Sequence, residues 1–271
     1  MMYIIDGHAH IFPEKIAAKA TAGISEFYDT EMDNQVASCD NLIKNGQQAG
    51  ISKYLVHSVA TTPKQVQSIN NFLSEECKKR PEFIGFAALH PDFEDIEDEV
   101  ERCIELGLKG VKLHPDIQKF LLDEDKALRI YRAIEGRLPL LIHMGDFRYQ
   151  YSKPARLARV LDMFPRLDCI GAHFGGWSET EEAIKHLKSR RCWVDTSSTY
   201  GFIKNLDYMK HLISEFGADR VVFGTDFPMW RADYELEWLL KCGLSEEELE
   251  LILHKNIENI LASYEHGKRL V

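Results

Sequence analysis

The sequence predicts a (β/α)₈ barrel, an α/β fold in which eight parallel strands are each followed by a helix. Short β-branched or aliphatic runs recur along the chain, and each is followed by an amphipathic stretch; this pattern is typical of parallel strands joined by crossover helices. Eight such units in 271 residues give about 34 residues per unit, the size expected of this barrel. Most of the runs end on polar or ionisable residues, as expected where strand ends form a catalytic face.

The expected strands follow one another at an even interval. They cover residues 3–9, 53–58, 83–89, 110–114, 138–143, 168–173, 192–197 and 220–226. The amphipathic stretches between them include residues 96–106, 125–135, 156–164, 180–188 and 208–216. An open doubly wound sheet is the alternative, but it usually carries a glycine-rich phosphate turn after an early strand. No such turn is present, so the barrel is favoured.

Two additions to the eight units are expected within one domain spanning residues 1–271. The longest interval runs from Phe12 to about Val36, and it mixes small residues with Phe27, Tyr28 and an acidic stretch at 29–33. We expect this lid-like insertion to fold over the mouth of the barrel. After the eighth strand, Ser245-Glu-Glu-Glu248 matches a capping box. It opens an extra C-terminal helix, whose apolar face is expected to pack on the barrel exterior.

Composition narrows the classes of partner. The chain has 33 Lys+Arg and 43 Asp+Glu, a formal net charge of −10, with 45% hydrophobic residues. The hydrophobic content excludes a disordered chain, and a net acidic chain without a basic stripe argues against nucleic acid. Apolar runs such as 138–142 are too short to cross a membrane. The start does not resemble a signal peptide, and the six cysteines include no C-x-x-C pair. A cytoplasmic protein with reduced thiols is therefore expected.

The motif Asp6-Gly7-His8-Ala9-His10 is the strongest chemical signal. Residues two apart on a strand point to the same side, so Asp6, His8 and His10 are expected to face the barrel interior. Unpaired buried polar groups are costly, which makes packing a poor explanation for two imidazoles there. Imidazole is a preferred ligand of zinc and similar divalent ions. A lone His-x-His remains a weak signal on its own.

Three further strand ends strengthen the signal. They read Ile142-His143-Met144, Gly171-Ala172-His173-Phe174-Gly175-Gly176 and Gly224-Thr225-Asp226-Phe227-Pro228. With these motifs the chain resembles the amidohydrolase superfamily over essentially its full length. It is most similar to the amidohydrolase-2 group of metal-dependent TIM-barrel hydrolases and decarboxylases. That group includes enzymes resembling aminocarboxymuconate semialdehyde decarboxylase.

The resemblance implies a ligand set and roles for its members. His8, His10, His143 and Asp226 match the ligands of one divalent metal, and His173 matches a histidine beside the metal-bound water. Three nitrogens and one oxygen leave a position for water, as in catalytic zinc sites. Zn²⁺ is favoured, although Mn²⁺, Fe²⁺ or Co²⁺ could occupy the same ligands. Asp226 is expected to act as general base, and His173 to orient the water or stabilise developing negative charge.

Lys112 and His114, in the motif Lys112-Leu-His-Pro115, have two readings. In binuclear members of the superfamily a carboxylated lysine on strand four bridges two metals. That reading would recruit Lys112, with His143 and His173 on a second ion. The amidohydrolase-2 resemblance favours one metal instead, with Lys112 or His114 facing substrate.

Aromatic residues and arginines after the strands suggest the substrate class. Arg148 and Tyr149 follow strand five directly, and Trp230 follows strand eight. Aromatic walls with Arg148 suit a planar or unsaturated carboxylate, because guanidinium grips carboxylate in a bidentate fork. Arg231 is an alternative clamp. His57 and His90, also near strand ends, are expected to support the site or cap loops.

Three functions remain open. The first expectation is a hydrolase that cleaves a C–O or C–N bond (lactone, amide or ester) of a small, carboxylated or aromatic molecule through a metal-activated water. The second is a metal-dependent non-oxidative decarboxylase of an unsaturated or aromatic acid. The third is a non-catalytic metal- or ligand-binding barrel. P-loop, nucleophile-elbow and zincin motifs are absent. A homodimer is implied only by the resemblance.

Overall fold

The computed structural model describes residues 2–265 and 267–269, and it confirms the predicted barrel. Eight strands lie in chain order, each parallel to the next. Their bounds are β1 Ile5–His10, β2 Lys53–His57, β3 Phe83–Ala88, β4 Gly110–Leu113, β5 Leu140–Ile142, β6 Cys169–Gly171, β7 Cys192–Asp195 and β8 Val221–Val222. The Gly7 amide donates to the Phe223 carbonyl (2.8 Å) and the Asp226 amide to the His8 carbonyl (2.9 Å). These bonds join the last strand region to the first and close the barrel.

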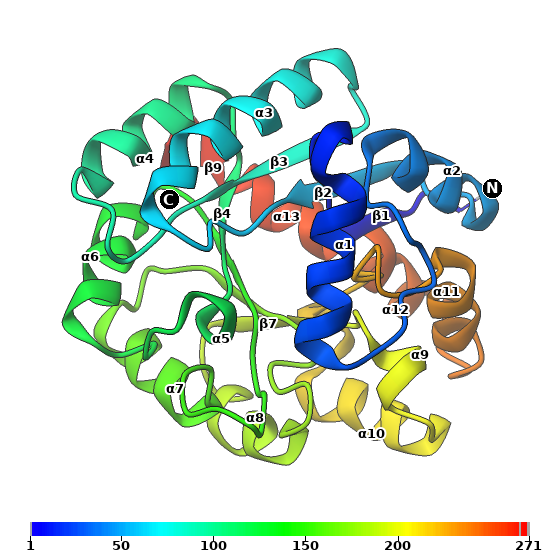
Figure 1. Ribbon diagram of the computed structural model, residues 1–271. Coiled ribbons are helices and arrows are strands. Elements are labelled where there is room, and N and C mark those ends of the chain that lie inside the picture. Colours follow the sequence, from blue (N-terminus) through cyan, green and yellow to red (C-terminus); the bar gives the residue numbers. More distant parts are fainter. Residues whose placement is uncertain (1, 266, 270–271) are drawn as a thin grey trace.

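Helices surround the strands (Figure 1). The α-helices are α1 Glu14–Tyr28, α2 Cys39–Ala49, α3 Val66–Lys79, α4 Ile96–Glu105, α5 Pro115–Gln118, α6 Asp125–Ile134, α7 Pro154–Met163, α8 Thr180–Leu187, α9 Thr199–Phe202, α10 Leu206–Phe216, α11 Ala232–Leu240, α12 Glu246–Glu250 and α13 Asn256–Ala262. Short 3₁₀ turns cover Pro63–Gln65 and Ala218–Arg220, Leu251–Lys255 forms a π-helical turn, and β9 Tyr264–Glu265 pairs with β10 Lys268–Arg269. Within the described residues, no helix is long and apolar enough to cross a membrane.

Strands β2 to β8 end earlier than their hydrophobic patterns predict, because the polar residues at their ends leave the sheet. His173 and Asp226 have φ values of 57° and 60°, a left-handed conformation that is uncommon outside glycine and recurs at functional sites. Each therefore lies on a sharp turn directly after its strand. The turns point the side chains over the carboxyl end of the barrel instead of extending the sheet.

Strand β1 does not alternate as predicted. Its register against β2 shifts between Asp6 and Ala9, the signature of a β-bulge. Ile5 therefore joins the apolar interior, and the Asp6 carboxylate instead accepts hydrogen bonds from the amide (3.0 Å) and hydroxyl (2.6 Å) of Thr225. Asp6 thus ties β1 to the β8 turn. The bulge restores the inward direction at His8.

The C-terminal helix closes the floor of the barrel, contrary to the expected exterior packing. Ile257 and Ile260 of α13 belong to the same apolar cluster as interior strand residues such as Leu55, Leu141 and Val222. Without α13, this apolar cluster would be exposed to water at the end of the barrel opposite the polar strand ends. Its burial by the helix is therefore favourable. The predicted capping box at Ser245 and Glu248 is confirmed, with the Glu248 amide donating to Ser245 Oγ (3.2 Å).

Candidate metal centre and substrate cavity

Three of the four predicted metal ligands converge on one point. The Oδ1 atom of Asp226 lies 3.4 Å from His8 Nε2 and 3.5 Å from His10 Nε2. Two ligands bonded to one ion at zinc-like distances in tetrahedral geometry are separated by about 3.4 Å. Burial opposes ionisation of Asp226, but His8 and His10 outweigh it and hold the pKa of that carboxyl well below its ordinary value. The donor set and its spacing therefore fit a divalent cation.

Asp195, at the end of β7, orients the first of these ligands. Its Oδ2 atom lies 2.8 Å from His8 Nδ1, so the proton on that nitrogen points to the carboxylate and Nε2 carries the lone pair that a metal ligand needs. Burial tends to raise the pKa of Asp195, but His8, His173 and Ser197 lower it to about 2. The carboxylate is therefore charged at neutral pH, and its other oxygen accepts the amide protons of His173 (2.8 Å) and Ser197 (3.1 Å).

Replacing Asp195 by asparagine is expected to weaken metal binding by about 10- to 100-fold, the usual cost of losing a carboxylate behind a metal-bound histidine. The amide cannot hold His8 in the same tautomer with the same charge. Competition against a chromophoric chelator measures the affinity. Asp168→Asn is the matched control, because Asp168 is also buried and ion-paired, with Arg191, but precedes β6 at the opposite end of the barrel. Equal affinities in the two variants would contradict the role of Asp195.

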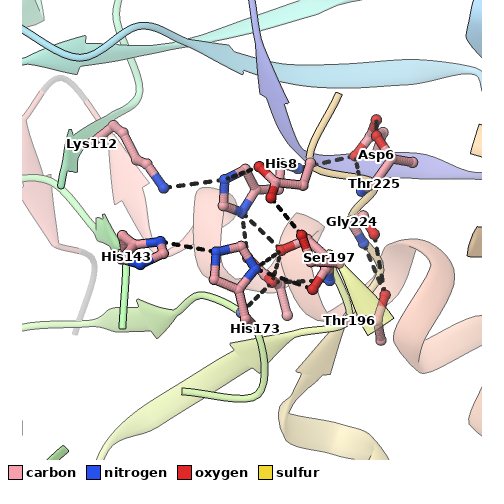
Figure 2. Close-up of polar contacts among 12 residues, drawn as sticks. Asp6, His8, Lys112, His143, His173, Thr196, Ser197, Gly224 and Thr225 are labelled. Atoms are coloured by element: carbon pink, nitrogen blue, oxygen red, sulfur yellow. Dashed lines mark hydrogen bonds and ion pairs between the residues drawn. The ribbon is translucent and has the colours of Figure 1, made fainter. Parts of the chain in front are cut away.

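His173 lies between the other predicted ligand and β7 (Figure 2). Its Nδ1 atom lies 2.8 Å from Ser197 Oγ, and its Nε2 atom lies 3.0 Å from His143 Nδ1. The Nε2 atom of His143 faces Asp116 Oδ2 at 3.6 Å. His143 thus lies across His173 from Ser197, and its contacts include His173, Tyr28, His114 and Asp116.

The strand-four residues reach the same region. Lys112 Nζ lies 3.2 Å from His8 Nε2 (Figure 2), and burial lowers the pKa of this lysine to about 8. His114 stacks on His143, with ring centroids 3.9 Å apart and planes 7° from parallel. One possible ligand atom each of His114, Asp116 and His143 lies within 4.8 Å of the others, so this group could also hold an ion.

A small cavity of about 20 Å³ opens beside these groups. Five imidazoles and one carboxylate line one part of it, and an isoleucine pair, a proline, a methionine and a tyrosine line the rest. The lining residues are His8, His10, Ile24, Tyr28, His114, Ile117, His143, His173, Asp226, Pro228 and Met229. Ile24 and Tyr28 come from α1, which Figure 1 shows in front of the strands, so the expected insertion does contribute to the cavity.

Of the five predicted substrate-binding residues, only His114 belongs to this lining; Lys112, described above, and Arg148, Tyr149 and Trp230 lie outside it. The Arg148 guanidinium bonds to both oxygens of the Asp146 carboxylate and donates to the Phe27 carbonyl (2.8 Å). Tyr149 stacks on Phe27, with ring centroids 5.8 Å apart. Trp230 Nε1 donates to Ser198 Oγ (3.0 Å), and that hydroxyl donates to Asp226 Oδ2 (2.6 Å). Trp230 therefore touches the site through Ser198.

Several residues of this region carried little signal in the sequence. Asp195 and Ser197 stood at a predicted strand end, but their contacts with two histidines depend on how the strands meet in space. Tyr28 was noted only as part of the insertion. His57 is fully buried and packs against the rings of His8 and His10, with centroids 4.9 Å and 4.4 Å away, and neither of its nitrogens has a hydrogen-bond partner. A bound ion or water beside these rings would satisfy it.

Comparison with known proteins gives a family and a set of relatives. Residues 5–262 match the family described as Amidohydrolase (Amidohydro_2). The decarboxylase orsB of Emericella nidulans is 26% identical over 163 residues, which are 58% of this chain and 44% of that protein. The chain thus matches less than half the length of this relative. A gamma-resorcylate decarboxylase of Polaromonas sp. strain JS666 is 27% identical over 244 residues, 70% of this chain and 74% of that protein.

A solved structure shares the fold. The dihydroxybenzoic acid decarboxylase of Polaromonas sp. JS666, with bound manganese and the inhibitor 2-nitroresorcinol, superposes with a TM-score of 0.72. It is 18% identical, and the match covers 97% of each chain. At this identity the likeness supports the barrel architecture, and it agrees with the strand order described above.

Proposed function

The chain belongs to the amidohydrolase-2 family, and from this membership and its cavity we propose that it is a metal-dependent, non-oxidative decarboxylase of an aromatic carboxylic acid. The observation that carries the proposal is the position of Asp226. Its carboxylate lies among imidazoles at one side of a cavity whose other side is formed largely by Ile24, Ile117, Pro228 and Met229. An aromatic ring placed against the apolar side would direct its carboxylate toward the metal ligands.

The hydrolase expected first from the sequence is wrong. The curated relatives named above are decarboxylases, and the second expectation agrees with them. The ligand set could not separate the two chemistries, because a Lewis-acidic ion that polarises an oxygen serves both. The apolar cavity wall favours decarboxylation for a further reason. Hydrolysis needs a water as reactant, whereas cleavage of a C–C bond to a carboxylate is helped by its exclusion.

We assign the proton transfer to Asp226. When bound, a divalent ion supplies Lewis-acid polarisation of a substrate oxygen. The reaction is Ar–COO⁻ + H⁺ → Ar–H + CO₂: the bond between ring carbon and carboxyl carbon breaks, and its electron pair forms the new C–H bond. The low pKa of Asp226 keeps it a carboxylate until it accepts a proton from a substrate hydroxyl or solvent. Once protonated, a carboxyl of low pKa is a strong acid and readily transfers its proton to the weakly basic ring carbon.

His173 and the metal ligands complete the assignment. We propose that His8, His10 and Asp226, together with His143, hold one divalent ion, and that His173 stabilises negative charge on the substrate oxygens. The manganese in the Polaromonas decarboxylase makes Mn²⁺ the ion to test beside the originally favoured Zn²⁺. Either ion accepts two imidazole nitrogens and one carboxylate oxygen as ligands. The availability of each metal and its preferred coordination geometry therefore decide which one binds.

Turnover of gamma-resorcylate (2,6-dihydroxybenzoate) with stoichiometric release of CO₂ tests the proposal. We expect chelator-treated protein to lose this activity and added Mn²⁺ or Zn²⁺ to restore it, because the metal would supply the Lewis-acid polarisation of the substrate oxygen. Elemental analysis follows the metal in parallel. Release of CO₂ that is indifferent to complete metal removal would contradict the proposal. So would the absence of CO₂ release from a panel of hydroxybenzoates by the metal-loaded protein.

A further inference from the structure

We propose that Glu235 is a positioning residue, which acts through Ser198 to hold the Asp226 carboxylate in the orientation that faces the ligand imidazoles. This inference rests on the proposed function, since it concerns one ligand of the proposed metal centre. Glu235 lies on α11, which packs against α9, the short helix that follows β7 (Figure 1). Glu235 is 1% exposed and does not line the cavity. Any effect of Glu235 on the site therefore passes through other residues.

The hydroxyl of Ser198 determines which oxygen of Asp226 faces the imidazoles. Ser198 Oγ donates to Asp226 Oδ2 (2.6 Å), while Asp226 Oδ1 faces the imidazole ligands described above. Trp230 Nε1 donates to the same Ser198 oxygen (3.0 Å). Because an indole N–H can only donate, the Ser198 proton is directed away from Trp230. Met229 Sδ is 3.6 Å from that oxygen, and a thioether is a weaker acceptor than a carboxylate. The proton therefore goes to Asp226.

Glu235 anchors the turn that carries Ser198. Its Oε2 atom accepts hydrogen bonds from the Thr199 hydroxyl (2.8 Å) and the Tyr200 amide (3.2 Å), and these two residues directly follow Ser198. Ser198 has a φ of 64°, a left-handed conformation that costs free energy in a residue other than glycine and persists only where the surroundings hold it. Ser198, Thr199 and Glu235 are all buried. The Glu235 carboxyl therefore holds the backbone that points the Ser198 hydroxyl toward Asp226.

The environment of Glu235 supplies a conservative and a disruptive variant. Burial raises the pKa of this carboxyl well above its ordinary value, although the hydrogen bonds from Thr199 and Tyr200 oppose the shift. A neutral carboxyl is therefore favoured, and glutamine reproduces its size and its acceptor oxygen. Alanine removes the acceptor and leaves the Thr199 hydroxyl and the Tyr200 amide without their partner.

Metal affinity in a double-mutant cycle tests the proposal without any need for turnover. Chelator competition with Mn²⁺ is applied to wild type, Ser198→Ala, Glu235→Ala and the double variant. We expect Ser198→Ala to weaken Mn²⁺ binding by about tenfold and Glu235→Ala by about fivefold, near the lower end of the usual cost of losing support behind a metal ligand. Because Glu235 acts through Ser198, the double variant should stay at about tenfold.

Two outcomes of the cycle would overturn the proposal. The first is a loss of about 50-fold in the double variant, the product of the two single effects, which would show that the residues act independently. The second is wild-type affinity in either single variant. If Glu235→Ala does not fold, Thr199→Val takes its place in the cycle, since it removes the hydroxyl that donates to Glu235 with little change in size.

A rescue and a matched control separate positioning from a general loss of stability. Glu235→Gln keeps the acceptor and should bind Mn²⁺ within about twofold of wild type; a loss as large as that of Glu235→Ala would contradict the anchoring role. Glu99→Ala is the control, because Glu99 is also buried and accepts from two side chains, Asn70 of α3 and Arg102 of α4 (2.7 Å each). It should keep wild-type affinity.

The assays also separate the two proposals. A coupled loss of Mn²⁺ affinity in the cycle, without any CO₂ release by the metal-loaded wild type, refutes only the decarboxylase. CO₂ release by the wild type, with unaltered affinity in Glu235→Ala, refutes only the role of Glu235.

Discussion

Replacing Asp226 by asparagine is expected to lower kcat for decarboxylation by about 10³-fold, within the range typical for loss of a positioned acid–base group. The amide has nearly the same size and retains an oxygen that can accept from Ser198, which now donates to Asp226 Oδ2 (2.6 Å). It cannot, however, take up and deliver a proton. It also lacks the negative charge that lies 3.4 Å and 3.5 Å from the ligand nitrogens of His8 and His10.

Steady-state kinetics at saturating metal, with metal content measured on the same samples, separates these two effects. We expect the loss in kcat to persist when metal content is brought to the wild-type level by added Mn²⁺. Asp219→Asn, at an exposed aspartate before β8, is the matched control and should leave kcat unchanged. Activity of Asp226→Asn within about threefold of wild type would contradict the assignment of proton transfer to this residue.

Replacing His10 by alanine is expected to weaken metal affinity by at least about 100-fold and to abolish turnover at stoichiometric metal. His10 Nε2 lies 3.5 Å from Asp226 Oδ1, the same oxygen that faces His8 Nε2 at 3.4 Å. Truncation removes one ligand and leaves a space that exogenous imidazole can fill. We therefore expect imidazole to restore part of both affinity and activity.

The affinity is measured by chelator competition and the activity by CO₂ release. His186→Ala supplies the matched control, because His186 lies on α8 at the outer surface and pairs with Glu182 at 3.2 Å. That variant should bind metal and turn over like wild type. If His10→Ala retained full metal affinity and activity, His10 would not be a ligand, and the ligand set proposed above would be wrong.

The barrel could be predicted from sequence because its signal is local and repeated. Each strand is a short apolar run and each helix an amphipathic one, so eight weak signals at an even spacing reinforce one another. Two features depended on contacts that local pattern does not carry. The bulge in β1, which turns Asp6 toward Thr225, arises where two distant strands close the barrel. The docking of α13 under the floor follows from the open apolar end of that barrel.

The candidate site was predictable to the extent that it lies at strand ends. His8, His10, His173 and Asp226 could be grouped because the carboxyl ends of barrel strands meet on one face. Tyr28 could not, since its position depends on how α1 folds back over the mouth and on the anchoring of Phe27 by Arg148. Arg148 was read as a substrate clamp because the sequence does not show that Asp146 faces its guanidinium.

Isotope labelling tests the central claim, that this site breaks a C–C bond and does not add water. Gamma-resorcylate is turned over in D₂O and, separately, in H₂¹⁸O, and the aromatic product is examined by mass spectrometry. Decarboxylation through a delivered proton predicts one deuterium on the ring carbon that lost the carboxylate and no ¹⁸O in the aromatic product. An aromatic product that carries ¹⁸O from water, or that keeps its carboxyl carbon, would contradict the account.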